Sequence, residues 1–321
     1  MSGASWVLGV DSGGSGLRVA LAPADDLGRA VATASAVPVR TSGAGIDPEH
    51  MVGQLVPMAR ELLGRVGDVP LGGVALGAAG MATLGDGLRA ELPGALAREL
   101  DVERLALAAD GVTAYAGALG QRRGAVVAAG TGMIALGTDL TDWRRADGWG
   151  HLLGDCGGGS WIGQCGLGAA MRAFDGRRGG SKALLAAAEE RFGPAVELPG
   201  LIYPRTDRPA ALASFAPDVA RCAADGDPVA AEILRAAAVH IAEAAAAVCP
   251  ADGGEVALTG GLFRTGEPLL GPLRVELAGQ LPRATVVSAA GDPLHGSLVI
   301  ASALAEDGLR LPLDPRLLHV P

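Results

Sequence analysis

The hydrophobic and polar positions of the first third of the chain alternate between two patterns, one typical of strands and one typical of helices. Short apolar runs bounded by glycine turns come first and predict strands, whereas longer amphipathic segments that follow predict helices. The expected strands lie at 6–10, 17–22, 28–37, 71–76 and 104–108. The expected helices lie at 48–66, 86–99 and 110–119. Strands that alternate with helices predict an α/β fold with a mainly parallel sheet.

The opening pattern returns about 118 residues later, because residues 124–137 again read as strand, glycine turn and strand. After this repeat, helices are expected at 160–175, 181–192, 217–224, 227–248, 267–280 and 294–305, with strands at 255–259 and 285–288. A fold built from two related halves would produce such a repeat. We therefore predict two domains, 1–112 and 113–321, with the last helix packing back on the first domain.

Composition and charge narrow the classes of partner. The chain has 321 residues, of which 49% are hydrophobic and only 3% aromatic, so Ala, Leu and Val must build its core. The net charge of −9 argues against nucleic acid or an anionic membrane surface as a partner. No basic leader and no unbroken apolar run of membrane-spanning length is visible. The four scattered cysteines fit a reducing compartment better than a zinc site, so we expect a cytoplasmic protein.

Lysine usage excludes two common ways of holding ATP. Lys182 is the only lysine, and it lies in Gly-Gly-Ser-Lys-Ala at the start of an expected helix. A P-loop needs a lysine directly after its glycine-rich run, and a protein kinase needs one on a strand. Phosphates must therefore be held by backbone N–H groups, hydroxyls or a metal ion.

Two glycine turns have the composition that such phosphate binding needs. Asp11 is followed by Ser12-Gly13-Gly14-Ser15-Gly16, and the repeat contains Gly130-Thr131-Gly132. Small residues let the backbone approach a ligand closely and can aim N–H groups at an anion. Asp11 would repel bare phosphates but would suit a Mg²⁺ ion held between carboxylate and phosphates. Ordinary hairpin turns remain an alternative for both segments.

Three further segments combine glycines with a carboxylate or a strand end. Asp110 follows a predicted strand and opens a helix, where it could be a general base or simply a helix cap. The run 148–163 surrounds Asp155 with glycines and two tryptophans, which favours a ligand loop over a glycine-rich surface loop. Gly260-Gly261 end a strand before a helix, which suits either a flat adenine ring or a tight turn.

Taken in order, these segments resemble the N-acetylglucosamine kinase and BadF/BadG-type ATPase family of the actin-like sugar kinase superfamily. The resemblance implies two RNase H-like domains around a central cleft, with ATP and Mg²⁺ as cofactors and a homodimer as the assembly. Asp110 would be the catalytic base and Asp11 the residue directed at the metal. The implied nucleotide contacts are Ser12, Gly13, Gly14, Ser15, Arg18, Gly130, Thr131, Gly132, Gly226, Gly260 and Gly261. The implied sugar contacts are Asp110, Gly148, Trp149, Gly150, His151 and Asp155.

The resemblance implies an ATP-dependent kinase that phosphorylates an amino sugar such as N-acetylglucosamine or glucosamine, at O6. Two family residues are absent: the chain contains no asparagine for the loop at 41–45, and Cys156 replaces a glutamate after Asp155. The sequence therefore does not identify the sugar. A sugar-binding regulator or degenerate kinase of the same fold, and an ATPase activator of a dehydratase or reductase, are the alternatives. His151 is also compatible with a purely structural role.

Overall fold

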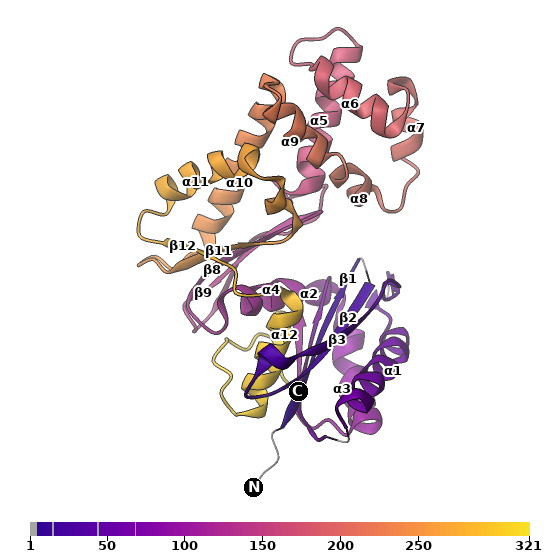
Figure 1. The fold of residues 1–321 in the computed structure, drawn as a ribbon, viewed down its shortest axis with the longest axis vertical. Helices are drawn as coiled ribbons and strands as arrows, with labels where there is room; N and C mark the ends of the chain where they lie inside the picture. The colour runs from indigo at the N-terminus through magenta and orange to yellow at the C-terminus, as the bar shows by residue number, and fades with distance from the viewer. Residues whose placement is uncertain (1–4, 15, 44, 68) are drawn as a thin grey trace. The chain divides into compact units, whose positions relative to one another are not determined.

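The chain divides into two α/β units (Figure 1). The computed structural model describes residues 5–14, 16–43, 45–67 and 69–321. The first unit contains the described residues up to Gly124 together with Thr138–Trp143 and Ser288–Pro321, and the second contains Ala125–Gly137 and Arg144–Val287. The boundary expected near residue 112 falls inside a buried helix, and the division lies at Gly124 instead. Within the described residues, no helix is both long and apolar enough to cross a membrane.

The first unit is built on a six-stranded sheet with the order β13-β7-β6-β1-β2-β3. Its strands are β1 (Trp6–Gly13), β2 (Gly16–Pro23), β3 (Val31–Ser35), β6 (Leu71–Ala78), β7 (Leu105–Ala109) and β13 (Leu318–His319). A short hairpin of β4 (Thr41–Ser42) and β5 (Gly45–Ile46) accompanies it. Strand β6 runs parallel to β1 and β7, whereas β2 is antiparallel to β1 and β3, and β13 to β7. The sheet is therefore mixed rather than mainly parallel, because a glycine turn joins β1 directly to β2.

Helices cover both faces of this sheet (Figure 1). They are α1 (Pro48–Val66), α2 (Met81–Leu84), α3 (Asp86–Leu100), α4 (Asp110–Leu119) and α12 (Pro293–Ala305), with a 3₁₀ turn at Leu27–Arg29. Helices α4 and α12 pack on one another and on β1 and β6, while α1 packs on β2, β3 and α3. Helix α12 crosses α4 closely, since a Cβ on Gly296 would lie 1.9 Å from the carbonyl oxygen of Thr113. The last helix thus belongs to the first unit.

The second unit has a five-stranded sheet with the order β10-β9-β8-β11-β12. Its strands are β8 (Gly124–Ala129), β9 (Met133–Thr138), β10 (Trp143–Asp147), β11 (Glu255–Thr259) and β12 (Thr285–Ser288). Its helices are α5 (Gly159–Phe174), α6 (Lys182–Phe192), α7 (Leu198–Ile202), α8 (Arg208–Ala213), α9 (Ala216–Ala224), α10 (Pro228–Val248) and α11 (Glu267–Gln280), with 3₁₀ turns at Ala195–Glu197 and Gly261–Thr265.

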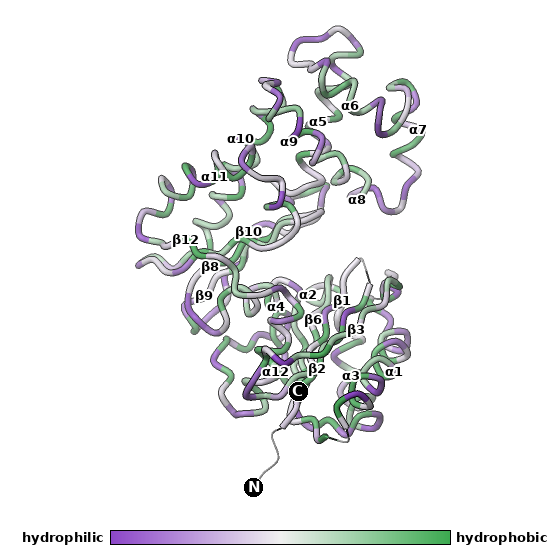
Figure 2. Tube along the Cα trace, viewed as in Figure 1, coloured by the Kyte–Doolittle hydropathy of each residue, from purple (hydrophilic) through white to green (hydrophobic). Residues whose placement is uncertain are grey.

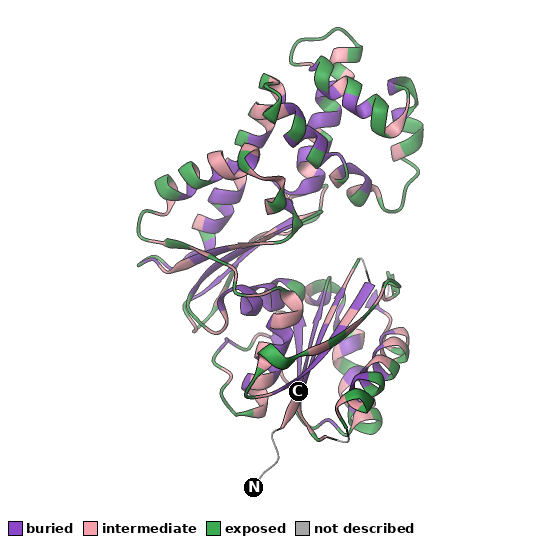
Figure 3. Ribbon diagram, in the orientation of Figure 1, coloured by how far each residue is buried: buried purple, intermediate pink, exposed green. Residues whose placement is uncertain are grey.

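Both cores consist mainly of Ala, Leu and Val, as the composition predicts. The central strands of the first unit are apolar and buried (Figures 2 and 3). In the second unit, alanines of α10 at positions 237, 238, 242 and 245 are fully buried and let neighbouring helices approach. Phe215 is a large aromatic side chain in this second core, and it packs near Phe192.

Candidate active site

The first glycine turn carries an ion-paired cluster rather than an isolated aspartate. Asp11 on β1 lies opposite Arg18 on β2, and both Nε (3.0 Å) and one terminal nitrogen (2.6 Å) of Arg18 donate to Asp11 Oδ2. The other terminal nitrogen of Arg18 donates to Asp292 Oδ2 at 2.5 Å. Burial lowers the pKa of Arg18, but the two carboxylates outweigh burial and raise it. Arg18 is therefore a permanent cation that joins two acidic side chains.

The turn beside this cluster leaves its backbone open. Among the described residues, apart from the chain neighbours, no atom lies within 4 Å of the place where a Cβ of Gly13 or Gly14 would stand. Ser12 is buried, and its carbonyl accepts the N–H of Ala79 at 2.9 Å, which ties the end of β1 to the end of β6. Ser15, which we also expect at the nucleotide, lies outside the described residues. The open turn leaves room for a ligand to approach the peptide groups of Gly13 and Gly14.

Asp110 lies at the same edge of the sheet as Asp11. Asp11 is in register with Gly77 on β6, and Gly77 is in register with Ala108 on β7, two residues before Asp110. Two strand spacings separate β1 from β7, which is about 10 Å. The carboxyl ends of these parallel strands form one edge, so both aspartates belong to it.

Asp110 is an exposed residue in the first turn of α4. Ala109 is the N-cap, and Asp110 is the first helical residue, with its Oδ1 accepting the N–H of Gly111 at 2.9 Å. Asp110 is thus not the N-cap residue itself, although its carboxylate accepts a backbone N–H of the first turn. A carboxylate at this position is stabilised by the positive end of the helix dipole.

In the second unit, the second glycine turn is docked against the start of α5. Gly130 donates its N–H to the carbonyl of Gly132 at 2.9 Å, which closes the turn between β8 and β9. The carbonyls of Gly130 and Thr131 accept the N–H groups of Gly159 (2.9 Å) and Ser160 (2.8 Å). Thr131 itself is an exposed residue of this turn.

Asp155 connects the tryptophan-containing loop to this second turn. Its Oδ1 accepts the N–H of Gly150 at 3.1 Å, and a Cβ on Gly132 would lie 2.4 Å from its Oδ2. Burial raises the pKa of Asp155, as does the nearby negative charge of Asp147, while backbone N–H groups of Gly150 and Met133 oppose the shift. The two expected ligand segments of the second unit are therefore in contact through one carboxylate.

Two residues that sequence reasoning missed hold this loop. Asp147 accepts the backbone N–H of Asp155 on Oδ1 (2.5 Å) and that of Cys156 on Oδ2 (2.9 Å), and its own φ is +58°. Arg145 donates to the carbonyls of Asp147 (3.1 Å) and Gly148 (2.5 Å), and its guanidinium lies 4.3 Å from the Trp149 ring centroid. The only sequence signal for these two residues was the aspartate, Asp147, directly before Gly-Trp-Gly.

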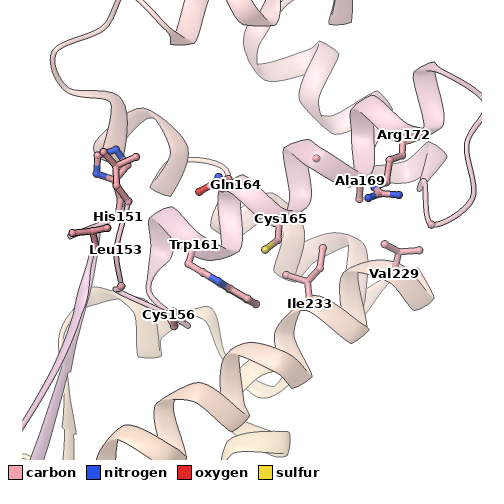
Figure 4. Close-up of a pocket in the computed structure, with 14 residues that line it drawn as sticks. His151, Leu153, Cys156, Trp161, Gln164, Cys165, Ala169, Arg172, Val229 and Ile233 are labelled. Carbon is pink, nitrogen blue, oxygen red and sulfur yellow. The ribbon is translucent and has the colours of Figure 1, made fainter. Parts of the chain in front are cut away.

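A groove of about 690 Å³ lies behind the loop, between α5 and the start of α10 (Figure 4). Its lining includes His151, Cys156 and Trp161, and Trp161 also makes an edge-to-face contact with His240. His151 Nε2 is buried and has no hydrogen-bond partner among the described residues. Burial raises the pKa of the Cys156 thiol, and nearby acidic groups raise it further. The loop also exposes Trp149, Leu152 and Leu153, which the core does not use.

The three glycines expected near the nucleotide base differ in their surroundings. Gly260 has φ +105°, and a Cβ there would lie 2.2 Å from the carbonyl oxygen of Ala129, so only glycine fits beside β8. Gly226 has φ +93° with open space around it, directly after α9. Gly261 begins the 3₁₀ turn Gly261–Thr265. A tight backbone approach explains Gly260, and the termination of α9 explains Gly226.

The donor set of the first unit is compatible with Mg²⁺. Among the described residues, no group of three or more His, Cys, Asp or Glu side chains is arranged for a metal ion. Mg²⁺ nevertheless binds through one or two carboxylates plus water and substrate phosphates, so it needs no such group. The two hydrogen bonds that Arg18 donates to Asp11 both fall on Oδ2, which leaves Oδ1 as the oxygen suited to a cation.

Comparison with known proteins identifies relatives of this chain. The model of the BadF/BadG/BcrA/BcrD ATPase family matches residues 8–300. An N-acetylmuramic acid/N-acetylglucosamine kinase of Clostridium acetobutylicum is 30% identical over 201 residues, which cover 60% of this chain and 65% of that enzyme. The matched stretch is thus slightly less than two thirds of that relative.

Solved structures with the same fold include two proteins provisionally assigned as N-acetylglucosamine kinases. The protein of Chromobacterium violaceum is 28% identical with a TM-score of 0.67, covering 92% of this chain and 98% of its own. The protein of Porphyromonas gingivalis is 16% identical with a TM-score of 0.65, covering 92% and 97%, and shows similarity of fold alone.

Proposed function

The chain belongs to the BadF/BadG/BcrA/BcrD ATPase family, and we propose that it is an ATP-dependent kinase of an amino sugar, such as N-acetylglucosamine or glucosamine. The observation that supports this most strongly is the edge of the first sheet where Asp11 lies two residues before the end of β1 and Asp110 directly follows β7. The named activities of the Clostridium acetobutylicum and Chromobacterium violaceum relatives indicate the class of acceptor.

Asp110 is assigned as the general base. The residue is exposed, and its carboxylate would take the proton from the sugar O6 hydroxyl as that oxygen attacks the γ-phosphorus and ADP leaves. Phosphoryl transfer depends mainly on positioning and on stabilisation of negative charge. A carboxylate fixed on the first turn of a helix is suited to both orienting a hydroxyl and accepting its proton.

The phosphates of ATP are assigned to the two glycine turns. Gly13 and Gly14 leave open backbone in the first unit, and exposed Thr131 offers its hydroxyl in the second. Asp11 is the residue that would hold Mg²⁺, whose role when bound is to neutralise charge on the phosphate oxygens. Lys182 takes no part in this assignment, in keeping with the exclusion of lysine-dependent phosphate sites.

The sugar is assigned to Asp155 and the loop that it closes. Gly148 and Gly150, with φ of +72° and +84°, give this loop its tight turns, Trp149 is exposed on it, and His151 lines the groove beside it. Asp155 would accept hydrogen bonds from sugar hydroxyls in addition to those from Gly150 and Met133. The activator alternative requires cysteine thiolates, and burial raises the pKa of Cys156 and Cys165 instead.

The test is ADP release measured with a panel of sugars: N-acetylglucosamine, glucosamine, N-acetylmannosamine, N-acetylmuramic acid and glucose. We expect release that at least one amino sugar stimulates and that Asp110→Asn reduces by a factor of about 10²–10⁴, the usual contribution of a general base. Asp86→Asn is the matched control, because Asp86 also begins a helix, α3, and is exposed. ADP release that no sugar and neither substitution changes would contradict the proposal.

A further inference from the structure

One carboxylate beside the first glycine turn has no role in the assignments above. Asp292 precedes α12 in the sequence Asp292-Pro293, and it lies far from Asp11 along the chain. Its Oδ2 accepts a hydrogen bond from Arg18 at 2.5 Å, so three side chains from β1, β2 and the start of α12 form one cluster. We name Asp11, Arg18 and Asp292 the carboxylate–arginine cluster.

Asp292 is held firmly in this position. As the N-cap of α12, its Oδ1 accepts the N–H of His295 at 3.0 Å. A Cβ on Gly117 would lie 2.1 Å from the carbonyl oxygen of Asp292, so α4 packs directly against this residue. Further along α12, Ser297 donates its hydroxyl to the carbonyl of Val10 at 2.8 Å, which fixes the helix to β1 just before Asp11.

The hydrogen bonds of Arg18 determine how it can act on a cofactor. Its Nε and one terminal nitrogen are directed at Asp11, and its other terminal nitrogen is directed at Asp292. A guanidinium donates in a fixed planar fork, so these contacts fix its orientation. Carboxylates thus engage three of the five N–H donors of Arg18, and two of these three donors fall on Asp11.

The charges of the cluster explain why a second carboxylate matters. Two carboxylates and one guanidinium sum to a single negative charge, which attracts a divalent cation. Without Asp292, Arg18 and Asp11 would form a neutral pair, and Arg18 would be free to rotate over both oxygens of Asp11. The side chain of Asp11 is only 16% exposed, so water would screen the attraction between Arg18 and Asp11 only weakly.

We propose that Asp292 is a positioning residue that holds Arg18 on one oxygen of Asp11 and thereby keeps the other oxygen available to the divalent cation of the nucleotide complex. Asp292 acts through Arg18 and touches neither sugar nor phosphate. This assignment rests on the proposed use of ATP with Mg²⁺. Hydrogen-bonding partners of metal ligands commonly contribute 10–100-fold to metal affinity.

The test measures binding rather than turnover, with Mn²⁺ and the non-hydrolysable analogue AMP-PNP as probes. The Mn²⁺ affinity of the full chain with AMP-PNP present is measured by electron paramagnetic resonance for the wild type and Asp292→Asn. Asparagine caps helices as well as aspartate does, so this variant removes the charge while keeping the cap. We expect the dissociation constant for Mn²⁺ to rise by about 10–100-fold.

The chain contains a closely matched control at another helix start. Asp47 also precedes a proline, caps α1 by accepting the N–H of His50 at 3.0 Å, and pairs with Arg40 at 3.4 Å. Asp47→Asn should leave Mn²⁺ affinity unchanged. A second variant, Arg18→Lys, should weaken Mn²⁺ binding to a similar extent as Asp292→Asn, because lysine cannot hold two carboxylates in one plane.

The outcomes separate this inference from the proposed function. Equal Mn²⁺ affinity in the wild type and Asp292→Asn, or no Mn²⁺ binding to the wild type, would overturn the role of Asp292. A clear loss in Asp292→Asn but not in Asp47→Asn supports it, even if no sugar stimulates ADP release. In that last case the sugar kinase assignment would fail and the role of the cluster would stand.

Discussion

Asp147 offers the sharpest test of how the loop of the second unit is held, because one carboxylate accepts two consecutive backbone N–H groups. Those groups belong to Asp155 and Cys156, at 2.5 and 2.9 Å. The substitution Asp147→Ala removes both acceptors at once. It also places alanine at φ +58°, a left-handed conformation that aspartate, asparagine and glycine tolerate better.

The magnitude follows from these contacts. A hydrogen bond to a charged group contributes about 1.5–3 kcal/mol, so two give roughly 3–6 kcal/mol if neither N–H finds water. Asp147 is half-buried, so in the variant water will hydrogen-bond to the two N–H groups part of the time and recover part of that energy. We therefore expect the unfolding free energy to fall by about 2–4 kcal/mol. The left-handed backbone adds about 1 kcal/mol for alanine, which Asp147→Gly would not incur.

The assay combines urea unfolding with hydrogen exchange followed by mass spectrometry. Amide exchange in the peptide containing residues 155 and 156 should accelerate at least tenfold in Asp147→Ala, while peptides of β1 and β2 should not change. Asp139→Ala is the matched control, because Asp139 also accepts two backbone N–H groups, from Thr141 and Asp142, but in an exposed turn of the first unit. Unfolding free energy within about 0.5 kcal/mol of wild type, with unchanged exchange at 155 and 156, would refute the assignment.

Three further predictions concern Gly132, Asp155 and Lys182. Gly132→Ala places a Cβ 2.4 Å from Asp155 Oδ2, so it should displace that carboxylate and weaken sugar binding at least tenfold by calorimetry, whereas Gly168→Ala, with open space around it, should not. Burial raises the pKa of Asp155, so the ionised carboxylate lowers the stability of the folded state above that pKa, and this loss should disappear as the pH falls through the raised pKa. Carbon-detected titration should show Asp155 becoming protonated at a pH well above that of Asp139. Hydrogen bonds from Thr141 lower the pKa of Asp139 to about 2. Lys182→Ala should leave ATP affinity within twofold of wild type, and a large loss would contradict phosphate binding by backbone and hydroxyls.

The regular elements could be predicted where local signals were strong. The helix at 48–66 matches α1 (Pro48–Val66), because Asp47-Pro48 is a strong start signal and its apolar positions fall on one face. The strand at 255–259 matches β11 (Glu255–Thr259). Short elements without such signals were missed, including β10 (Trp143–Asp147), whose arginines and aspartate read as loop although the strand completes the edge of the second sheet.

The candidate site could be predicted only in part, because some of its contacts depend on the folded chain and not on local sequence. Glycine turns and aspartates next to them are visible in sequence because they depend on local backbone geometry. Asp292 acts through a tertiary contact, since it reaches Arg18 across 274 positions. Arg145 contacts only nearby residues, but its hydrogen bonds and its place against Trp149 depend on the turn geometry of the loop, which no residue pattern displays. No local pattern distinguishes Asp292-Pro293 from the helix start at Asp47-Pro48, so only the fold reveals its second hydrogen bond.

The central claim is that the γ-phosphoryl group of ATP is transferred to an amino sugar. Phosphorus NMR of the protein with ATP, Mg²⁺ and the most stimulating sugar of the panel tests this directly. We predict ADP and a sugar phosphate in equal amounts, with the new phosphorus signal split into a triplet by the two protons at C6. Inorganic phosphate in place of a sugar phosphate, at the same rate with and without sugar, would contradict the account.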